Sequence, residues 1–422
     1  IIRINENNNY IMNSNRLSKS PFKSLSSHPE VFISGGEGPY INTINVLSNL
    51  DLSPARGLKV LLKPNVGRIA PTGEGITTNP LVVAAAIDAF VAAGAEVAVG
   101  ESPIVGVKTF EAFDAAGITK IANERNCKLI DLDAGSFIKV PVPDGHVIDS
   151  IKVCPEVLEY DLVVSIPVIK MHMHTGVSIS IKNMKGCLWR RSKVELHMLP
   201  PVEGNEIRSI DIAITDMSGI LRPHLSIIDG TVGMEGLGPS AGSPKALDII
   251  AAGIDPFATD SVVCRLIGTR AEDIPHLSLG AKRGYGEIDI NNISITPEDW
   301  KKYIIPFTPP PKNLTIEFPN IKVLDNNSCS ACQSTVLLFL RRYRDKIFDY
   351  LPSDSLVNIA IGKGHENLPD KTICIGNCTA KHRNAGIFVH GCPPVGSAIL
   401  QAISGKPSID VMDGHSKTPD VE

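Results

Sequence analysis

The sequence predicts an α/β protein with a Rossmann-like, mostly parallel sheet and a smaller C-terminal α/β unit that is rich in cysteine. Strand and helix patterns alternate between residues 59 and 132 at the spacing of βαβ units, whose strands run parallel. Five of the nine cysteines fall between residues 329 and 392, after a Pro-rich stretch. The length of 422 residues also suits two or three domains.

The predicted elements follow the hydrophobic pattern of the chain. The first strand, residues 59–66, leads through a Gly- and Thr-rich loop into a helix that Asn79 caps and Gly94 ends. The later elements are a strand over 96–100, a helix over 107–125, a strand over 128–132, a hairpin over 136–153, a strand ending at Pro167, a helix over 205–220, a strand ending at Gly230, a strand over 247–253 and a helix over 256–267.

A short apolar strand at the centre of the chain, residues 161–166, is followed by a dense group of basic residues. These are Lys170, His172, His174, Lys182 and Lys185. Ligands of open α/β sheets bind outside the carboxyl ends of the strands, and ammonium groups are costly in a core. We therefore expect a functional site here; loop histidines without a ligand are the alternative interpretation.

Polar residues also follow other predicted strands, and parallel strands would bring them to the same crevice. We expect substrate binding by Lys63, Asn65, Lys170 and Glu235, and catalysis by His172, His174, Lys182 and Lys185. The lysines suit a carboxylate or phosphate, and the histidines suit proton transfer or a metal ion.

Composition excludes some classes of protein. The net charge of −4 lacks the basic excess of a nucleic-acid binder, and no apolar run is long enough to span a membrane. The first thirty residues lack the apolar region of a secretory signal, so we expect a cytoplasmic protein with reduced cysteines. The expected organisation is a disordered tail at 1–28, an α/β domain at 29–295, a Pro-rich linker at 296–325, a cysteine-cluster domain at 326–410 and a tail at 411–422.

The clustered cysteines predict a metal centre. Cys329 and Cys332 form a C-x2-C pair, Cys374 and Cys378 form a C-x3-C pair, and Cys392 precedes two prolines. A cubane cluster takes four thiolates, and proline after a ligand cysteine recurs in such sites. We predict one [4Fe–4S] cluster on Cys329, Cys332, Cys378 and Cys392, with Cys374 spare inside an apolar strand. A zinc site and unliganded thiols are the alternatives.

The other four cysteines are isolated from one another in the sequence. Cys127, Cys154 and Cys264 suit small core positions. Cys187, two residues after Lys185, has two open interpretations: a core position, or a position facing the basic site.

Several stretches resemble the DUF362 family: LLKPNV, the Thr-Thr-Asn-Pro before a helix, DLVVSIPVIKMHMHTGVSISIKNMKG, IIDGTVGMEGLGP and GIDPFATDSVVCRLIG. The resemblance covers about residues 58–290 and implies a cubane iron–sulfur region, which many members carry as C-x2-C-x2-C-x3-C-P runs. This chain has no such run; its CSAC-to-GCPP window is similar to a single-cluster tail. A weaker similarity is to the nickel-pincer lactate racemase group, in which His and Lys follow strands in the order of His174, Lys182, Lys185 and His197.

These observations predict an iron–sulfur redox enzyme that acts on an anionic small molecule and takes electrons from a donor protein. One alternative is a non-redox, metal-dependent isomerase or hydrolase whose cysteines bind a structural metal. Another is an anion-binding protein without turnover. The sequence contains no P-loop motif, and no G-x-G-x-x-G follows the first strand.

Overall fold

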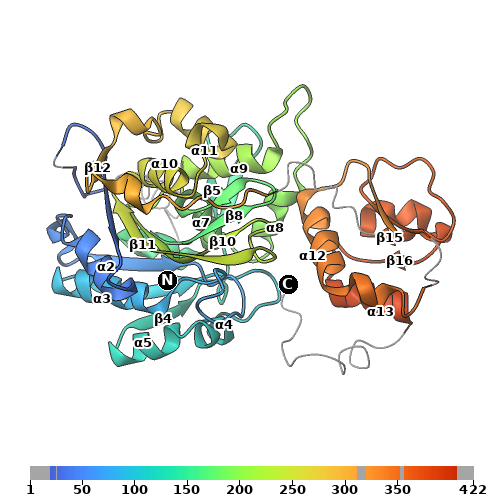
Figure 1. The fold of residues 1–422 in the computed structure, drawn as a ribbon, viewed down its shortest axis with the longest axis horizontal. Coiled ribbons are helices and arrows are strands. Elements are labelled where there is room, and N and C mark those ends of the chain that lie inside the picture. The colour runs from blue at the N-terminus through green and yellow to red at the C-terminus, as the bar shows by residue number, and fades with distance from the viewer. Residues whose placement is uncertain (1–19, 25, 311–319, 352–355, 406–422) are drawn as a thin grey trace, which may run out of the picture. The chain divides into compact units, whose positions relative to one another are not determined.

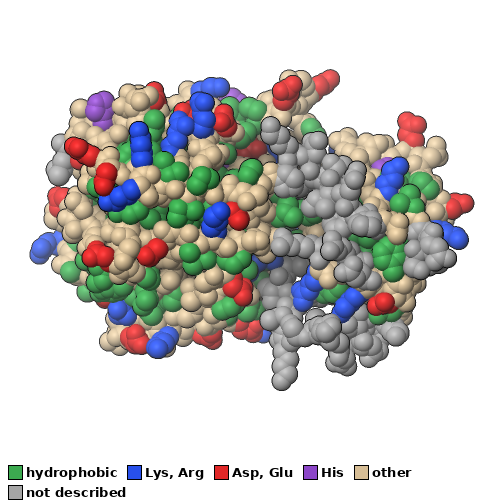
Figure 2. Space-filling model, viewed as in Figure 1, with side chains coloured by type: hydrophobic (Ala, Val, Ile, Leu, Met, Phe, Trp, Pro, Cys, Tyr) green, Lys and Arg blue, Asp and Glu red, His purple; other side chains and the backbone are tan. Residues whose placement is uncertain are grey.

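The computed structural model describes residues 20–24, 26–310, 320–351 and 356–405 (Figure 1). The chain divides into two compact units, one of residues 1–196 and 201–310 and the other of residues 197–200 and 311–422. On the face shown in Figure 2, Lys and Arg side chains are interspersed with Asp and Glu. Within the described residues, none of the helices combines the length and the apolar character that a membrane span needs.

The first unit is built on a 10-stranded sheet. Eight of its strands follow the order β12-β1-β11-β10-β7-β2-β3-β4; the other two are β8, which pairs with β10, and β9, which pairs with β8. Its strands are β1 (Glu30–Gly35), β2 (Lys59–Pro64), β3 (Glu96–Glu101), β4 (Lys128–Asp131), β7 (Leu162–Ile166), β8 (Val168–His172), β9 (Gly176–Ser178), β10 (Leu225–Glu235), β11 (Ser243–Gly253) and β12 (Ser294–Thr296). Strands β4, β3, β2, β7 and β10 run parallel, which confirms the predicted α/β class. Strand β11 is antiparallel to both of its neighbours.

Helices cover both faces of this sheet, with α2, α3 and α5 on one face and α9, α10 and α11 on the other (Figure 1). The helices of the first unit are α2 (Pro39–Leu47), α3 (Pro80–Ala92), α4 (Thr109–Ala115), α5 (Ile118–Glu124), α6 (Pro155–Glu159), α7 (Ser180–Asn183), α8 (Ser192–Glu195), α9 (Ser209–Ser218), α10 (Pro256–Leu266) and α11 (Pro275–Lys282). Because both faces are covered, every residue of β7 is buried, and the strand is apolar almost throughout.

Local signals in the sequence placed several elements correctly. Helix α3 starts after Asn79, whose side chain accepts a hydrogen bond from the backbone N–H of Leu81 at 2.9 Å. The predicted hairpin is the antiparallel pair β5 (Ile138–Pro141) and β6 (Ser150–Val153). The predicted helix over 107–125 is instead two helices, because Gly117 adopts a left-handed conformation with φ of 77°.

Long-range pairing changed other predictions. The stretch after Pro167 is not a loop, because Val168–His172 forms strand β8, which pairs with β10 and β9. The strand predicted to end at Gly230 and the strand predicted over 247–253 are both too short, since β10 continues to Glu235 and β11 starts at Ser243. Strand β1 and helix α2 had no counterpart among the predicted elements.

The expected N-terminal tail is described only at residues 20–24 and 26–28. There Phe22 is buried and packs edge-on against Phe90 of α3, with ring centroids 6.4 Å apart. Residues 311–319 of the expected linker and all of the tail at 411–422 lie outside the described residues. Within that linker, Phe307 is buried and its backbone N–H bonds to the carbonyl of Ile267.

The second unit is a smaller α/β structure, as predicted. Four parallel strands form a sheet in the order β13-β14-β15-β16. Its elements are β13 (Ile321–Asp325), α12 (Ser330–Ile347), β14 (Val357–Ile361), β15 (Ile373–Ile375), the 3-10 segment η7 (Asn377–Ala385), β16 (Phe388–Val389) and α13 (Gly396–Ser404).

Candidate functional site

The four predicted ligand cysteines all follow strands of the small parallel sheet. Cys329 lies after β13 and is the N-cap of α12, and Cys332 lies in the first turn of that helix. Cys378 follows β15, and Cys392 follows β16. Because parallel strands end at the same edge of a sheet, the topology brings three separated segments to one place.

The thiol of Cys332 is the centre of this group. Its pKa is raised, first by the hydrogen bond between its thiol and Cys329 and then by burial, and the charges of Cys329, Cys378 and Cys392 raise it further. All three other thiols therefore lie within electrostatic reach of Cys332. The pKa of Cys329 is lowered to about 6, mainly by the hydrogen bond from Cys332, with help from backbone N–H groups at the start of α12.

Backbone hydrogen bonds join the two loops that carry Cys378 and Cys392. The N–H of Asn377 donates to the carbonyl of Gly391 at 2.8 Å, and the N–H of Gly391 donates to the Asn377 side chain at 3.0 Å. Gly376 has a φ of +89°, and a Cβ atom there would lie 3.3 Å from Sγ of Cys332. A residue without a side chain at position 376 thus leaves room beside the central thiol.

Cys374 stands apart from this group. It is fully buried in β15, its thiol donates to the carbonyl of His382 at 3.5 Å, and burial alone raises its pKa. In the part of the chain that the structure describes, no three His, Cys, Asp or Glu side chains are arranged to hold a metal ion. The [4Fe–4S] cluster on Cys329, Cys332, Cys378 and Cys392 therefore stays a prediction that rests on the number of thiols, since a cubane cluster takes four.

In the first unit, the buried Lys182 lies within electrostatic reach of two other buried lysines, Lys170 and Lys185. Lys170 is on β8, Lys182 on α7 and Lys185 on the 3-10 segment η2 (Met184–Cys187), and each is at least nine-tenths buried. Burial first, and then the charges of Arg68 and Lys182, lower the pKa of Lys170 to about 7. Burial lowers the pKa of Lys182 to about 8, against the opposing charge of Asp211.

Lys185 extends this cluster. Its pKa lies well below the ordinary value, because of burial first and then the charges of Lys182 and Lys193. Lysines that depress one another's pKa values leave a region in which a bound anion would be stabilised. The three lysines Lys170, Lys182 and Lys185 are called the lysine cluster below.

Asn65 and Lys63, both predicted to bind substrate, have different surroundings. Lys170 donates hydrogen bonds to Oδ1 of Asn65 at 2.7 Å and to the carbonyl of Ile76, so Asn65 lies at the lysine cluster. Lys63 is fully buried, and its three donors are used by the carbonyl of Pro64, by Glu101 and by Asn183. Lys63 is therefore a structural ion-pair residue rather than a substrate ligand.

Glu235 also uses its carboxylate within the protein. Its Oε2 atom accepts from the Lys245 ammonium at 3.1 Å and from the backbone N–H of Thr308 at 2.8 Å. The Thr308 hydrogen bond is the main cause of its lowered pKa. The Oε2 atom of Glu235 therefore already has two donors within the protein.

The two predicted histidines are buried at the tip of the β8–β9 hairpin, with ring centroids 5.9 Å apart. Nδ1 of His172 accepts from the backbone N–H groups of His174 and Thr175, and Nδ1 of His174 lies 3.0 Å from the Arg208 guanidinium. Since backbone amides and guanidinium only donate, each neutral ring carries its proton on Nε2. The Nδ1 atoms of both rings are thus used in hydrogen bonds within the protein. His197, in the order implied by the racemase similarity, belongs to the second unit.

Two acidic groups at this site were not predicted. Asp211 on α9 lies 3.1 Å from Nδ1 of His276 on α11, both are almost fully buried, and the charge of Asp211 acts on Lys182. Asp260 on α10 accepts from the backbone N–H groups of Ser180 and Ile181, and burial raises its pKa to about 7. The sequence did contain a signal for them, an acidic residue among the apolar residues of a predicted helix. A buried carboxylate is rare unless it has a partner, so such a residue indicates a partner or a site.

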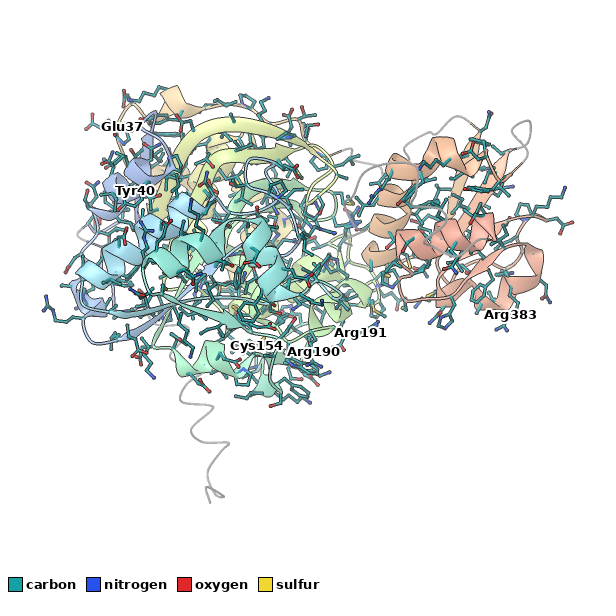
Figure 3. The ribbon with its side chains drawn as sticks, turned by 90° about the horizontal axis from the view of Figure 1, so that it is seen from below. Glu37, Tyr40, Cys154, Arg190, Arg191 and Arg383 are labelled. Atoms are coloured by element: carbon teal, nitrogen blue, oxygen red, sulfur yellow. The ribbon has the colours of Figure 1, made fainter. Side chains whose placement is uncertain are left out.

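The other singleton cysteines are buried or partly buried, as expected. Burial raises the pKa of Cys127 to about 11 and that of Cys187 to about 12. The charge of Lys63 acts on Cys187, so this thiol lies near the buried ion pair. Figure 3 shows Cys154 in the same part of the molecule as the exposed Arg190 and Arg191.

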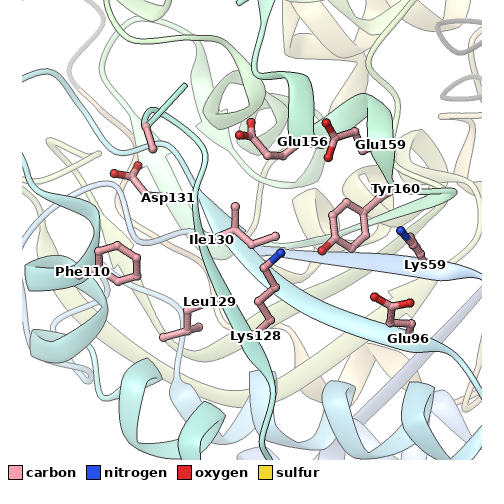
Figure 4. A pocket seen from close by; sticks show the side chains of 11 residues that line it. Lys59, Glu96, Phe110, Lys128, Leu129, Ile130, Asp131, Glu156, Glu159 and Tyr160 are labelled. Atoms are coloured by element: carbon pink, nitrogen blue, oxygen red, sulfur yellow. The ribbon is translucent and has the colours of Figure 1, made fainter. Parts of the chain in front are cut away.

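A separate pocket of about 500 Å³ lies along the edge strand β4 (Figure 4). Lys59, Glu96 and Lys128, which begin β2, β3 and β4, line one side, and Glu156 and Tyr160 line another. Burial raises the pKa of both Glu156 and Tyr160. The start of the strands is opposite to the strand ends that carry the lysine cluster, so this pocket is distinct from that site.

Replacing Lys170 with methionine tests the burial of its ammonium. Because the pKa of Lys170 is about 7 in the folded chain and 10.5 ordinarily, only the unfolded chain holds this proton between those values. The free energy of unfolding of the wild type should therefore rise with pH in this window, by at most about 1.4 kcal/mol per pH unit for one proton. Urea denaturation at about pH 7.5 and 9.5 should show that the free energy of unfolding rises less in Lys170→Met than in the wild type. Lys59→Met, at an exposed position, should keep the wild-type rise; equal rises in all three proteins would contradict the expected result.

The comparisons with known proteins follow the boundary between the two units. Residues 60–265 match the family described as "Domain of unknown function (DUF362)", a range that includes the lysine cluster and excludes the five clustered cysteines. The chain is also similar to "Thylakoid-associated protein sll1697" of Synechocystis sp., with 26% identity over 228 residues that cover 54% of this chain and 68% of that protein. Through residues 60–265, this chain belongs to the DUF362 family.

Proposed function

We propose that this protein is an iron–sulfur redox enzyme, with one [4Fe–4S] cluster in its C-terminal unit and an anionic small molecule as the substrate of its DUF362 domain. The observation that carries the proposal is the position of Cys332 within electrostatic reach of Cys329, Cys378 and Cys392. Four thiols from three segments of a cysteine-rich window, with a fifth thiol turned away, suit a shared inorganic core better than a structural pair.

The surroundings of these thiols support the thiolate form that a cluster needs. Backbone N–H groups of Cys332 and Ala331 lower the pKa of Cys329 at the start of an 18-residue helix. Such N–H groups also tune a bound cluster. A cluster held by Cys329, Cys332, Cys378 and Cys392 would supply one-electron transfer.

The lysine cluster supports the anionic substrate. Asp211 is the buried carboxylate that acts on Lys182, and the charge of Glu101 acts on Lys170 less than those of Arg68 and Lys182 do. A carboxylate or phosphate would relieve the mutual repulsion within the lysine cluster and gain charge-assisted hydrogen bonds. Lys170, Lys182 and Lys185 come from adjacent short elements, which suits a preformed site.

Anaerobic purification followed by optical and electron paramagnetic resonance spectroscopy tests the redox part of this proposal. The protein should be brown, its visible absorption should bleach with dithionite, and the reduced form should give a paramagnetic signal. A brown protein that dithionite does not bleach would instead favour a structural cluster. A colourless protein with stoichiometric zinc would overturn the redox proposal in favour of a structural metal.

A further inference from the structure

The pocket along β4 has no part in the proposed function. Its volume of about 500 Å³ lies within the range of small-molecule sites, roughly 300–1,000 Å³. Four carboxylates and two ammonium groups line it, which leaves an excess of two negative charges. The charged groups of the lining are those of Glu96, Asp131, Glu156 and Glu159 and those of Lys59 and Lys128.

Glu156 is the carboxylate of this pocket that lacks a donor where water does not reach it. Its Oε2 atom is buried and has no hydrogen-bond partner among the described residues. Asp131, in contrast, accepts from the Thr109 hydroxyl at 2.6 Å and from the backbone N–H of Asp133 at 3.0 Å. A buried carboxylate oxygen without a donor is costly, and the ammonium group of a ligand would supply that donor.

The two lysines of the lining leave this need unmet. Both Lys59 and Lys128 are exposed, and within the described part of the chain no ion pair joins either of them to Glu96, Glu156 or Glu159. Water screens exposed charges, so these ammonium groups offset little of the negative potential at the partly buried Glu156.

Tyr160 lies among three of the carboxylates. The charges of Glu96, Glu159 and Glu156 all act on its hydroxyl group, so all three lie within electrostatic reach of this side chain. In Figure 4, Glu159 and Glu96 lie on opposite sides of the Tyr160 ring. Aromatic rings attract ammonium groups to their faces, and Ile130 adds apolar surface to the lining. The pocket thus has two acidic ends with an apolar surface between them.

We propose that this pocket binds an aliphatic diamine, with one ammonium group at Glu156 and Glu159 of α6 and the other at Glu96 of β3. The two positive charges of a diamine match the charge excess of the lining, and its hydrocarbon chain matches the surface of Tyr160 and Ile130. In the described residues, no three His, Cys, Asp or Glu side chains are arranged to hold a metal ion, which favours an organic dication. This inference is independent of both the iron–sulfur cluster and the lysine cluster.

Isothermal titration calorimetry of the full-length protein with 1,4-diaminobutane tests this proposal at low ionic strength, where ion pairs are screened least. One diamine should bind per chain, and n-butylamine, which has one ammonium group, should bind about tenfold more weakly. Glu156→Gln and Glu96→Gln should each weaken diamine binding about tenfold without a change in circular dichroism. The matched control is Glu298→Gln, an exposed position outside the pocket, which should keep the wild-type Kd.

Four results would overturn the proposal. Absence of diamine binding would remove the site, and wild-type affinity in Glu156→Gln would remove its central carboxylate. Equal affinities for the diamine and for n-butylamine would show that the second ammonium group is not recognised. Binding of Mg²⁺ as tight as that of the diamine would show that the pocket attracts any dication, without recognition of the hydrocarbon chain. The exposed Glu96 keeps the test valid if Glu156→Gln does not fold.

Discussion

Replacing Cys332 with serine is expected to abolish the cluster, reducing bound iron from about four atoms per chain to almost none. Cys332 is 4% exposed, and its pKa responds to the charges of Cys329, Cys378 and Cys392, so it is the thiol with all three others within electrostatic reach. Serine keeps the size of the side chain but is a poor ligand for iron at neutral pH. Iron and acid-labile sulfide in the anaerobically purified variant measure the effect.

Cys374→Ser is the matched control for that variant. Cys374 is equally buried and lies in the same unit, but its thiol bonds to the carbonyl of His382. It should therefore retain the iron content of the wild type, even with some loss of stability. Equal iron loss in both variants would show that the effect comes from general unfolding, and equal retention would show that Cys332 is not a ligand.

Replacing Glu101 with glutamine is expected to lower the free energy of unfolding by about 3–5 kcal/mol, the usual cost of removing one partner of a buried ion pair. Both carboxylate oxygens of Glu101 lie 2.9 Å from Nζ of Lys63, and both side chains are almost fully buried. The carboxylate also accepts from the backbone N–H groups of Val66 and Ser102. Glutamine supplies one acceptor and turns a donor toward groups that are themselves donors.

Urea denaturation of Glu101→Gln and of Glu111→Gln measures this difference. Glu111 makes a 2.7 Å ion pair with Lys108, but both side chains are more than half exposed, so its loss should have no measurable effect. The double variant Lys63→Met/Glu101→Leu should recover part of the stability, because apolar groups of similar size leave no unpaired charge. Similar losses for Glu101→Gln and Glu111→Gln would contradict a structural role for the buried pair.

Local chemistry in the sequence predicted much of the fold. Asn79 before Pro80 marked the start of α3, and the apolar β-branched run at Leu162–Ile166 marked β7. Parallel strands then explained why Asn65 and Lys170 meet, since these residues follow the neighbouring strands β2 and β7 in the chain. These features depend on a few neighbouring residues, which is why a single sequence reveals them.

Other features depend on partners that are distant in the chain. Val168–His172 looked like a loop after Pro167, but its strand is defined by pairing with β10, more than fifty residues later. The contacts of Lys63 with Glu101 and Asn183 join residues far apart in the chain, so the sequence did not reveal them. The pairing of Asp211 with His276 joins two helices, and no local pattern indicates it.

The most direct test of this account is the content of iron, acid-labile sulfide and zinc in the anaerobically purified wild-type protein. One [4Fe–4S] cluster on Cys329, Cys332, Cys378 and Cys392 predicts about four iron atoms and about four sulfides per chain, with little zinc. About one zinc ion per chain without sulfide, or no metal at all, would contradict the central claim.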